Sequence, residues 1–97
     1  MTELLQTDTF KDWMHRLRDT RARTAIAARL ARLAAGLAGD VEPVGGGVFE
    51  MRVHHGPGYR VYFKRHRDVM IILLCAGDKR TQRRDIERAK RMVGEME

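Results

Sequence analysis

The 97-residue sequence has 19 Lys and Arg against 13 Asp and Glu, a formal net charge of +6, and 43% hydrophobic residues. This length suits one small domain, predicted over residues 1–97, and the apolar content excludes a disordered basic tail. The charge indicates an anionic partner, most often nucleic acid, although an inert basic surface would have the same composition. The sequence has no leader-like segment and no apolar run of membrane length, so we expect a cytoplasmic protein without a membrane partner.

The first part of the chain predicts an edge strand and two helices. Residues 1–7 are short and mixed in character, as in an edge strand, and Asp8 or Thr9 could cap the first helix. That helix is indicated by Phe10, Trp13, Met14 and Leu17 at helical spacing. After a turn near Asp19-Thr20, the second helix would end at Gly36 or Gly39 and complete a helical hairpin. Its apolar stripe is Ala22, Ile26, Leu30, Leu33 and Leu37.

The second part predicts a sheet and a terminal helix. Residues 41–44 suit a short strand before the turn Gly45-Gly46-Gly47, and the apolar run 69–76 suits a central strand covered on both faces. Cys75 within that run predicts a buried structural thiol. Residues 81–96 form an amphipathic pattern. The expected class is α+β, with an N-terminal helical hairpin packed on an antiparallel sheet and a C-terminal helix. The stripe of the terminal helix is Ile86, Ala89, Val93 and Met96.

The segment from Val48 to Lys64 predicts a β-hairpin with two chemically different faces. Its residues alternate in character, as on a strand with one buried face. The core face would carry Phe49, Met51, Val53, Tyr59, Val61 and Phe63. The other face would carry Glu50, Arg52, His54, Arg60, Tyr62 and Lys64, a cationic set that suggests a phosphate site.

The same alternation predicts the register of this hairpin. Opposed residues share a face, so the loop needs an odd number of residues, and Gly56-Pro57-Gly58 suits a three-residue loop. The predicted pairs are Arg52 with Tyr62, His54 with Arg60, and Glu50 with Lys64.

RNA cleavage requires a base for the 2′-hydroxyl, stabilisation of the phosphorane and neutralisation of the 5′-oxygen. The sequence has no HExxH motif, paired cysteines or compact acidic cluster, so we expect no metal or other cofactor. Arg52 and Arg60 would then hold the phosphate, and Lys79 would overlook the same face from the end of the central strand. The available proton-transfer groups are Tyr62, His54 and Glu50.

Structural interpretations compete with these roles. His54 and His55 could be solvated loop residues, and Glu50 could simply pair with Lys64. Trp13 suits the core. The arginines after Lys79 could form a solvated helix face, but as a group they suggest a track for an RNA backbone. The predicted RNA-binding residues are Lys64, Arg65, Arg67, Arg80, Arg83 and Arg84.

Several segments together resemble the RelE/ParE toxin superfamily, and more narrowly its phage Gp49-like or HigB-like branch of addiction-module killer proteins. The resemblance covers nearly the whole chain, in order and at compatible spacing. The segments are Phe10-x-x-Trp13, Arg29-Leu30-x-Arg32-Leu33, Gly39-Asp40, Gly47-Val48, Glu50-Met51-Arg52, Gly56-Pro57-Gly58-Tyr59-Arg60-Val61-Tyr62-Phe63 and Gly77-Asp78-Lys79-x-Thr81-Gln82-x-x-Asp85-Ile86.

This resemblance implies a RelE-like microbial RNase fold and a toxin of a type II toxin-antitoxin module. RelE- and HigB-type members cut mRNA in the ribosome, with basic residues that map here to Arg52, Arg60 and Lys79. The implied partners are the ribosome, mRNA and a cognate antitoxin, typically a helix-turn-helix DNA-binding protein. The chain departs from RelE at Glu50 and at Asp85-Ile86, so Tyr62, His54 and Glu50 all stay candidates for the base. The alternatives are a ParE-like inhibitor of DNA gyrase and an inactive RNA-binding relative.

Overall fold

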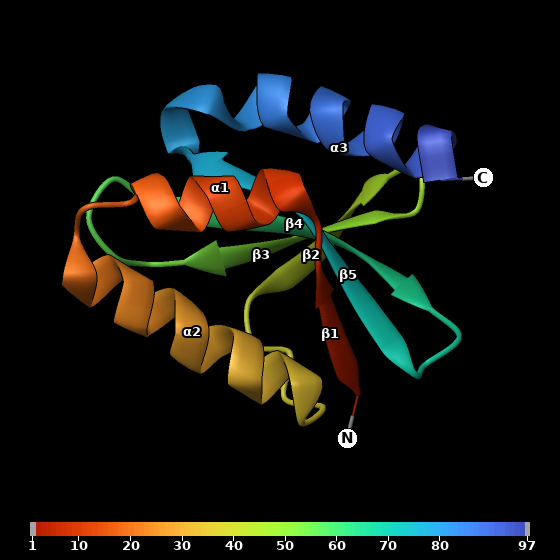
Figure 1. Cartoon of the computed structure of the whole chain (residues 1–97), viewed down its shortest axis with the longest axis horizontal. Coiled ribbons are helices and arrows are strands. Elements are labelled where there is room, and N and C mark those ends of the chain that lie inside the picture. Colours follow the sequence, from red (N-terminus) through yellow and green to blue (C-terminus); the bar gives the residue numbers. More distant parts are fainter. Residues whose placement is uncertain (1, 97) are drawn as a thin grey trace.

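The computed structural model describes residues 2–96 and has an α+β fold (Figure 1). A five-stranded sheet has the order β1-β5-β4-β3-β2. β1 runs parallel to β5, and all other neighbours are antiparallel, so the sheet is mixed rather than purely antiparallel. The elements are β1 (Glu3–Gln6), α1 (Asp8–Arg16), α2 (Thr20–Ala34), β2 (Val41–Gly45), β3 (Val48–Val53), β4 (Tyr59–His66), β5 (Met70–Asp78), a 3₁₀ turn η1 (Lys79–Thr81) and α3 (Gln82–Met96).

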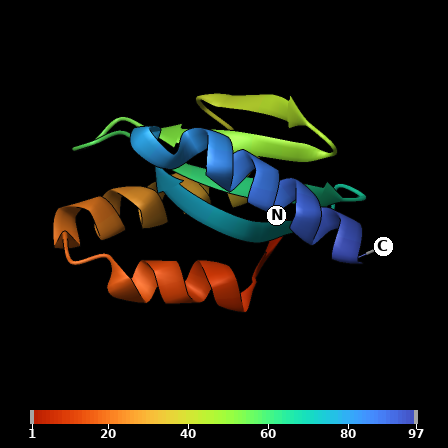
Figure 2. The same ribbon diagram turned by 90° about the horizontal axis from the view of Figure 1, so that it is seen from above.

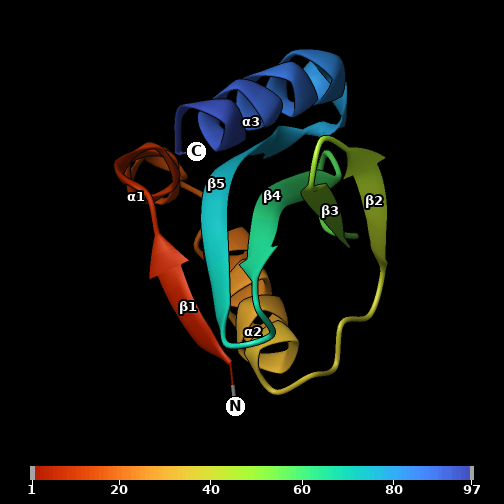
Figure 3. The same cartoon turned by 90° about the vertical axis from the view of Figure 1, so that its right-hand side faces the viewer.

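The sheet separates two hydrophobic clusters. The larger one joins α1 and α2 to the apolar face of the predicted hairpin, and it includes Phe10, Ile26 and Phe63. The smaller one joins α3 to the opposite face, around Tyr62 and Val93. Figure 2 shows α1 and α2 together on one side of the sheet, and Figure 3 shows β1 at the outer edge beside β5.

The predicted edge strand is confirmed at residues 3–6, with Met1 outside the described residues. The predicted caps of α1 were wrong, because Thr7 is the N-cap. Its Oγ1 accepts a hydrogen bond from the amide of Phe10 at 3.1 Å and donates to the carbonyl of Leu74 at 2.7 Å. The same hydroxyl therefore caps the helix and also links it to β5.

The helical hairpin is confirmed, with Asp19 as the N-cap of α2. The helix ends at Ala34, and Gly36 follows with a φ of +88°, a conformation that favours glycine. Four residues of the predicted stripe are buried, but Leu37 lies beyond the helix and is 59% exposed.

The hairpin faces are confirmed, but the predicted register was wrong by two residues. Arg52 opposes Arg60, and Glu50 opposes Tyr62, so residues 54–58 form a five-residue loop. A shift of two residues leaves every side chain on its predicted face. It also places Glu50 between cations and donors, where a buried carboxylate is stabilised.

β5 is covered on both faces, as predicted, but β4 is the central strand of the sheet. A bulge at Leu74 interrupts the alternation of β5 side chains between the two faces of the sheet. As a result, Leu73 faces α1 and α2, while Leu74 and Cys75 both face α3. Cys75 is fully buried, and burial raises the pKa of its thiol to about 11, which favours the predicted structural role. Val69 precedes the strand and is exposed.

The junction between β5 and α3 is closely packed around Gly77. A Cβ atom at Gly77 would overlap the carboxylate of Asp85 and approach the hydroxyl of Thr81. These two side chains share a hydrogen bond of 2.5 Å, and Asp85 is only 2% exposed. Glycine at this position therefore lets the first turn of α3 approach the strand.

We expect Gly77→Ala to destabilise the fold by about 1–3 kcal/mol, because the methyl group must displace Asp85. Urea denaturation would measure this change. Gly94→Ala is the matched control, since Gly94 lies in α3 with open space around it and should gain about 0.5–1 kcal/mol. Equal stabilities of wild type and Gly77→Ala would contradict the packing argument.

Candidate functional site

Glu50 is a fully buried carboxylate at the centre of the polar face of the hairpin. One oxygen accepts hydrogen bonds from Arg52 Nε at 3.1 Å and from an Arg60 Nη at 3.0 Å. The other oxygen accepts from the Tyr62 hydroxyl at 3.0 Å and from the Gln82 amide at 2.9 Å. Glu50 thus joins β3, β4 and the first residue of α3 in one network, and in the strand register it opposes Tyr62 rather than Lys64.

This network keeps Glu50 ionised. Burial acts to raise the pKa of Glu50, but hydrogen bonds from Gln82 and Tyr62, together with the nearby arginines, outweigh it and lower the pKa below its ordinary value of 4.5. The pKa of Tyr62 moves upward, because its hydroxyl is buried and donates to an anion. Tyr62 is fully buried, so a substrate at the surface does not reach it.

The two arginines of the predicted phosphate clamp differ in their surroundings. Arg52 contacts three carboxylates, because its remaining nitrogens lie 2.7 Å from Glu42 and 3.4 Å from Asp40. Arg60 has 13% of its side chain exposed and pairs with Glu50. Its Nε is buried with no hydrogen-bond partner among residues 2–96. An unpaired buried donor is unfavourable, so Arg60 would gain from an additional acceptor.

A pocket of about 420 Å³ opens where the β3–β4 loop meets η1. It brings together three of the predicted catalytic residues, Arg60, Lys79 and His54, although His54 and Lys79 are 25 residues apart in the chain. The remaining lining residues are His55, Gly56, Pro57 and Gly58.

Each histidine of this pocket contacts a carboxylate from outside the hairpin. His54 Nε2 lies 2.7 Å from an oxygen of Asp40, which precedes β2, and the His54 side chain is 75% exposed. His55 Nε2 lies 3.4 Å from Asp19, the N-cap of α2. The hydrogen bond with His54, together with nearby arginines, lowers the pKa of Asp40 despite its partial desolvation. Asp40 therefore stays anionic and orients the imidazole of His54.

The Gly-Asp-Lys segment places Lys79 at this pocket. Asp78 caps η1 by accepting a hydrogen bond from the Arg80 amide at 2.8 Å, and Thr81 completes a capping box. The Asp78 carboxylate also pairs with the Arg80 side chain at 3.0 Å. Lys79 is exposed at the start of this turn, beside Gly58 of the hairpin loop.

The structure divides the predicted RNA-binding residues into two groups. Arg80, Arg83 and Arg84 are exposed and line one depression next to Lys79. Arg65 lies near the other end of β4, roughly 17 Å along the strand from Arg60 and over the rings of Phe49 and Phe63. Lys64 and Arg67 also lie toward that end, so they are not part of the pocket.

Sequence reasoning missed Asp40, Asp19 and Gln82 as members of the site and gave His55 little weight. Their contacts join segments that are distant in the chain, so strand alternation could not reveal them. Asp40 and Gln82 do lie in the segments on which the family resemblance was based.

Among residues 2–96, no group of three or more His, Cys, Asp or Glu side chains is arranged to hold a metal ion. No helix in that range is long and apolar enough to span a membrane.

We expect Glu50→Gln to lower the free energy of unfolding by about 3–5 kcal/mol at neutral pH, because it leaves two arginines without their buried anion. The pKa of Glu50 is lowered by folding, so its stabilisation is lost as pH falls below 4.5 and through the lower folded value. The stability difference between wild type and variant should therefore shrink in acid. Urea titrations at several pH values would measure it.

Glu42→Gln is the control for this prediction, since Glu42 is an exposed partner of the same Arg52. It should cost less than about 1 kcal/mol. A Glu50→Gln difference that stays constant with pH would show that the carboxylate charge is not what stabilises the network.

The comparisons with known proteins agree with the resemblance seen in the sequence. The family described as "Phage derived protein Gp49-like" matches residues 12–93. An uncharacterized protein of Haemophilus influenzae (strain ATCC 51907 / DSM 11121 / KW20 / Rd) is 45% identical over 94 residues, which cover 97% of this chain and 95% of that protein. The chain therefore belongs to the Gp49-like family of phage-derived proteins, a toxin-like family related to RelE and HigB.

Proposed function

We propose that this protein is the toxin of a toxin-antitoxin module and a metal-independent endoribonuclease. The observation that carries the proposal is the pocket in which Arg60 and Lys79 meet His54 and His55, each histidine beside a carboxylate. Such a pocket offers groups for proton transfer and cations for a phosphate at one place.

In the proposed reaction, His54 accepts the proton of the 2′-hydroxyl while Asp40 holds the imidazole. The 2′-oxygen attacks phosphorus, and the bond from phosphorus to the 5′-oxygen breaks. The products are a 2′,3′-cyclic phosphate and a 5′-hydroxyl, whose proton comes from His55 or water. No change of oxidation state is needed, and the proton count balances.

Electrostatic stabilisation would come from Arg60 and Lys79. Arg60 is anchored by Glu50 on one side, so its guanidinium is held in place before a phosphate binds. Lys79 is exposed beside the loop and would offset charge on the leaving oxygen. Arg52 and Tyr62 take supporting roles in this proposal, because carboxylates occupy Arg52 and burial encloses Tyr62.

The proposed targets are translated mRNA in the ribosome, and the proposed inhibitor is a cognate antitoxin of the helix-turn-helix class. Support comes from the exposed Arg80, Arg83 and Arg84 beside Lys79, which extend the cationic surface beyond the pocket. These partners would place the protein in the cytoplasm.

One observation favours a second candidate, a toxin or RNA-binding protein that does not cleave. Most of the polar hairpin face is an internal ion-pair network rather than an open cationic surface. A ParE-like inhibitor of DNA gyrase or an inactive RNA-binding relative would not need an open cationic surface on this face. The two candidates differ in whether loss of the pocket groups abolishes toxicity.

We expect induced wild-type protein to stop growth and to create new 5′ ends within translated mRNA. Lys79→Ala and His54→Ala remove exposed pocket groups, so they should fold normally. Each should reduce cleavage by roughly 10²-fold or more, because each removes a proton-transfer or charge-stabilising group. Growth curves and transcriptome-wide mapping of 5′ ends would measure both effects.

Arg32→Gln is the control, since Arg32 is an exposed arginine of α2 outside the pocket. It should stay toxic and cleave normally. If growth stops with intact mRNA, and both pocket variants are as toxic as wild type, cleavage is not the activity and a gyrase-type target should be tested next.

Asp40 is proposed to act as a positioning residue for His54. Asp40→Asn should slow RNA cleavage in the wild-type background and add little in the His54→Ala background, because its effect passes through the imidazole. Single-turnover rates of the four proteins would give the coupling energy. Equal effects in both backgrounds would mean that Asp40 acts through Arg52 instead.

A further inference from the structure

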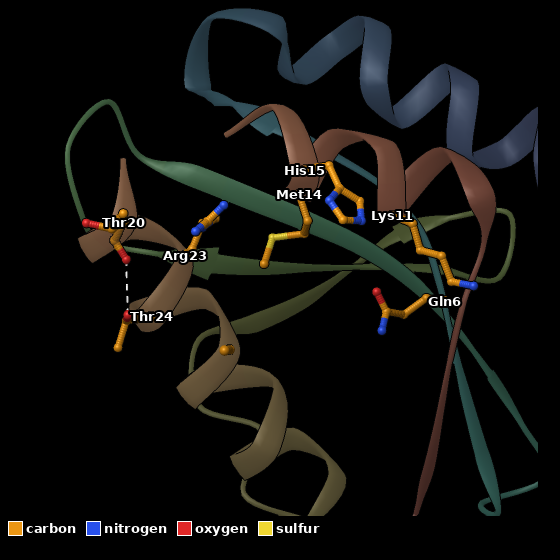
Figure 4. Close-up of a pocket in the computed structure, with 8 residues that line it drawn as sticks. Gln6, Lys11, Met14, His15, Thr20, Arg23 and Thr24 are labelled. Carbon is orange, nitrogen blue, oxygen red and sulfur yellow. Dashed lines mark hydrogen bonds between the residues drawn. The ribbon is translucent and has the colours of Figure 1, made fainter. Parts of the chain in front are cut away.

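A second groove lies between α1 and α2, on the helical side of the sheet. It has a volume of about 420 Å³. Figure 4 shows Met14 and His15 of α1 and Arg23 of α2 directed into the space between the helices, with Lys11 and Gln6 toward one end. The other lining residues are Thr20, Thr24 and Ala27.

The lining of this groove combines apolar surface with cationic side chains. It contains Lys11, Arg23 and His15, and no acidic residue of the described chain lines it. Lys11, His15 and Arg23 are exposed, and none of them forms an ion pair with an acidic side chain in the structure of residues 2–96. α2 itself carries four arginines and no acidic residue. Lys11 and Arg23 therefore offer the groove two cations for an anionic ligand.

One end of the groove lies near the pocket that contains Arg60 and Lys79. Thr20, at one end of the groove, follows Asp19, and Asp19 lies 3.4 Å from His55 of the pocket loop. The turn between α1 and α2 thus lies between the two depressions. A polyanion that reaches both passes the contact of Asp19 with His55.

We propose that the groove between α1 and α2 binds the phosphate backbone of the RNA segment that flanks the cleaved phosphate. RNA as the ligand rests on the proposed function. Lys11 of α1 and Arg23 of α2 contact phosphates, and the apolar lining around Met14 faces ribose. Alternating phosphates and sugars match a lining that carries both cations and apolar surface.

The test measures binding rather than cleavage. The probe is a fluorescein-labelled single-stranded oligoribonucleotide with 2′-O-methyl groups, which lacks the nucleophile and cannot be cut. The double variant Lys11→Gln/Arg23→Gln should bind about tenfold more weakly, and the slope of log affinity against log salt should fall by about 1.4, or two phosphate contacts. Fluorescence anisotropy at several salt concentrations would give both values.

The matched control is Arg16→Gln/Arg32→Gln, which removes one exposed cation from each of the same helices outside the groove. It should leave the salt slope unchanged. Thermal unfolding of both double variants would establish that they are folded. Identical affinity and slope for the two double variants would overturn the proposal and attribute the loss to overall charge.

The binding assay also separates this proposal from the proposed function. If binding requires Lys11 and Arg23 while wild type leaves mRNA on translating ribosomes intact, the groove is an RNA site and the cleavage proposal is wrong. If unmodified RNA is cut but the groove variant binds the probe as wild type does, cleavage stands and the groove proposal is wrong.

Discussion

The buried charge of Glu50 is the constraint on which the rest of the site depends. A carboxylate without solvent is stable in a protein only when cations and donors satisfy it. Here the two arginines, a tyrosine and a glutamine do so, from two strands and from the start of α3. This shell is complete in the observed register of β3 against β4, with α3 beginning at Gln82.

The position of the pocket follows from that network. Arg60 is held on the sheet by Glu50, and Gln82 ties the first residue of α3 to the same carboxylate. Lys79 precedes Gln82 by one turn of 3₁₀ helix. It therefore lies near the N-terminal end of β4, where Arg60 is located. Gly77 lets this junction close, because no side chain separates β5 from Asp85. A rigid sheet thus supports exposed groups on a loop and a short turn.

The same network changes the assignment of chemical roles. Arg52 and Tyr62 are residue types expected at a phosphate site. However, Arg52 contacts three carboxylates and Tyr62 is fully buried. His54 and Lys79 are exposed, whereas Arg52 and Arg60 are each partly exposed and held by carboxylates. The proposed function therefore assigns its chemical roles to the exposed groups of the pocket, and Arg52 and Tyr62 support them.

The sequence by itself determined the α+β class, the helical hairpin and the two faces of the β-hairpin, because periodicity assigns each side chain to a face whatever the register. It also led to Arg60, Lys79 and His54, which the structure brings to one pocket. Only the tertiary structure decided the two-residue register, the burial of Glu50 and the contact of Asp40 with His54. These features depend on which distant segments meet. Registers that differ by two residues keep every side chain on the same face, and the hydrogen bonds to the buried Glu50 distinguish between them.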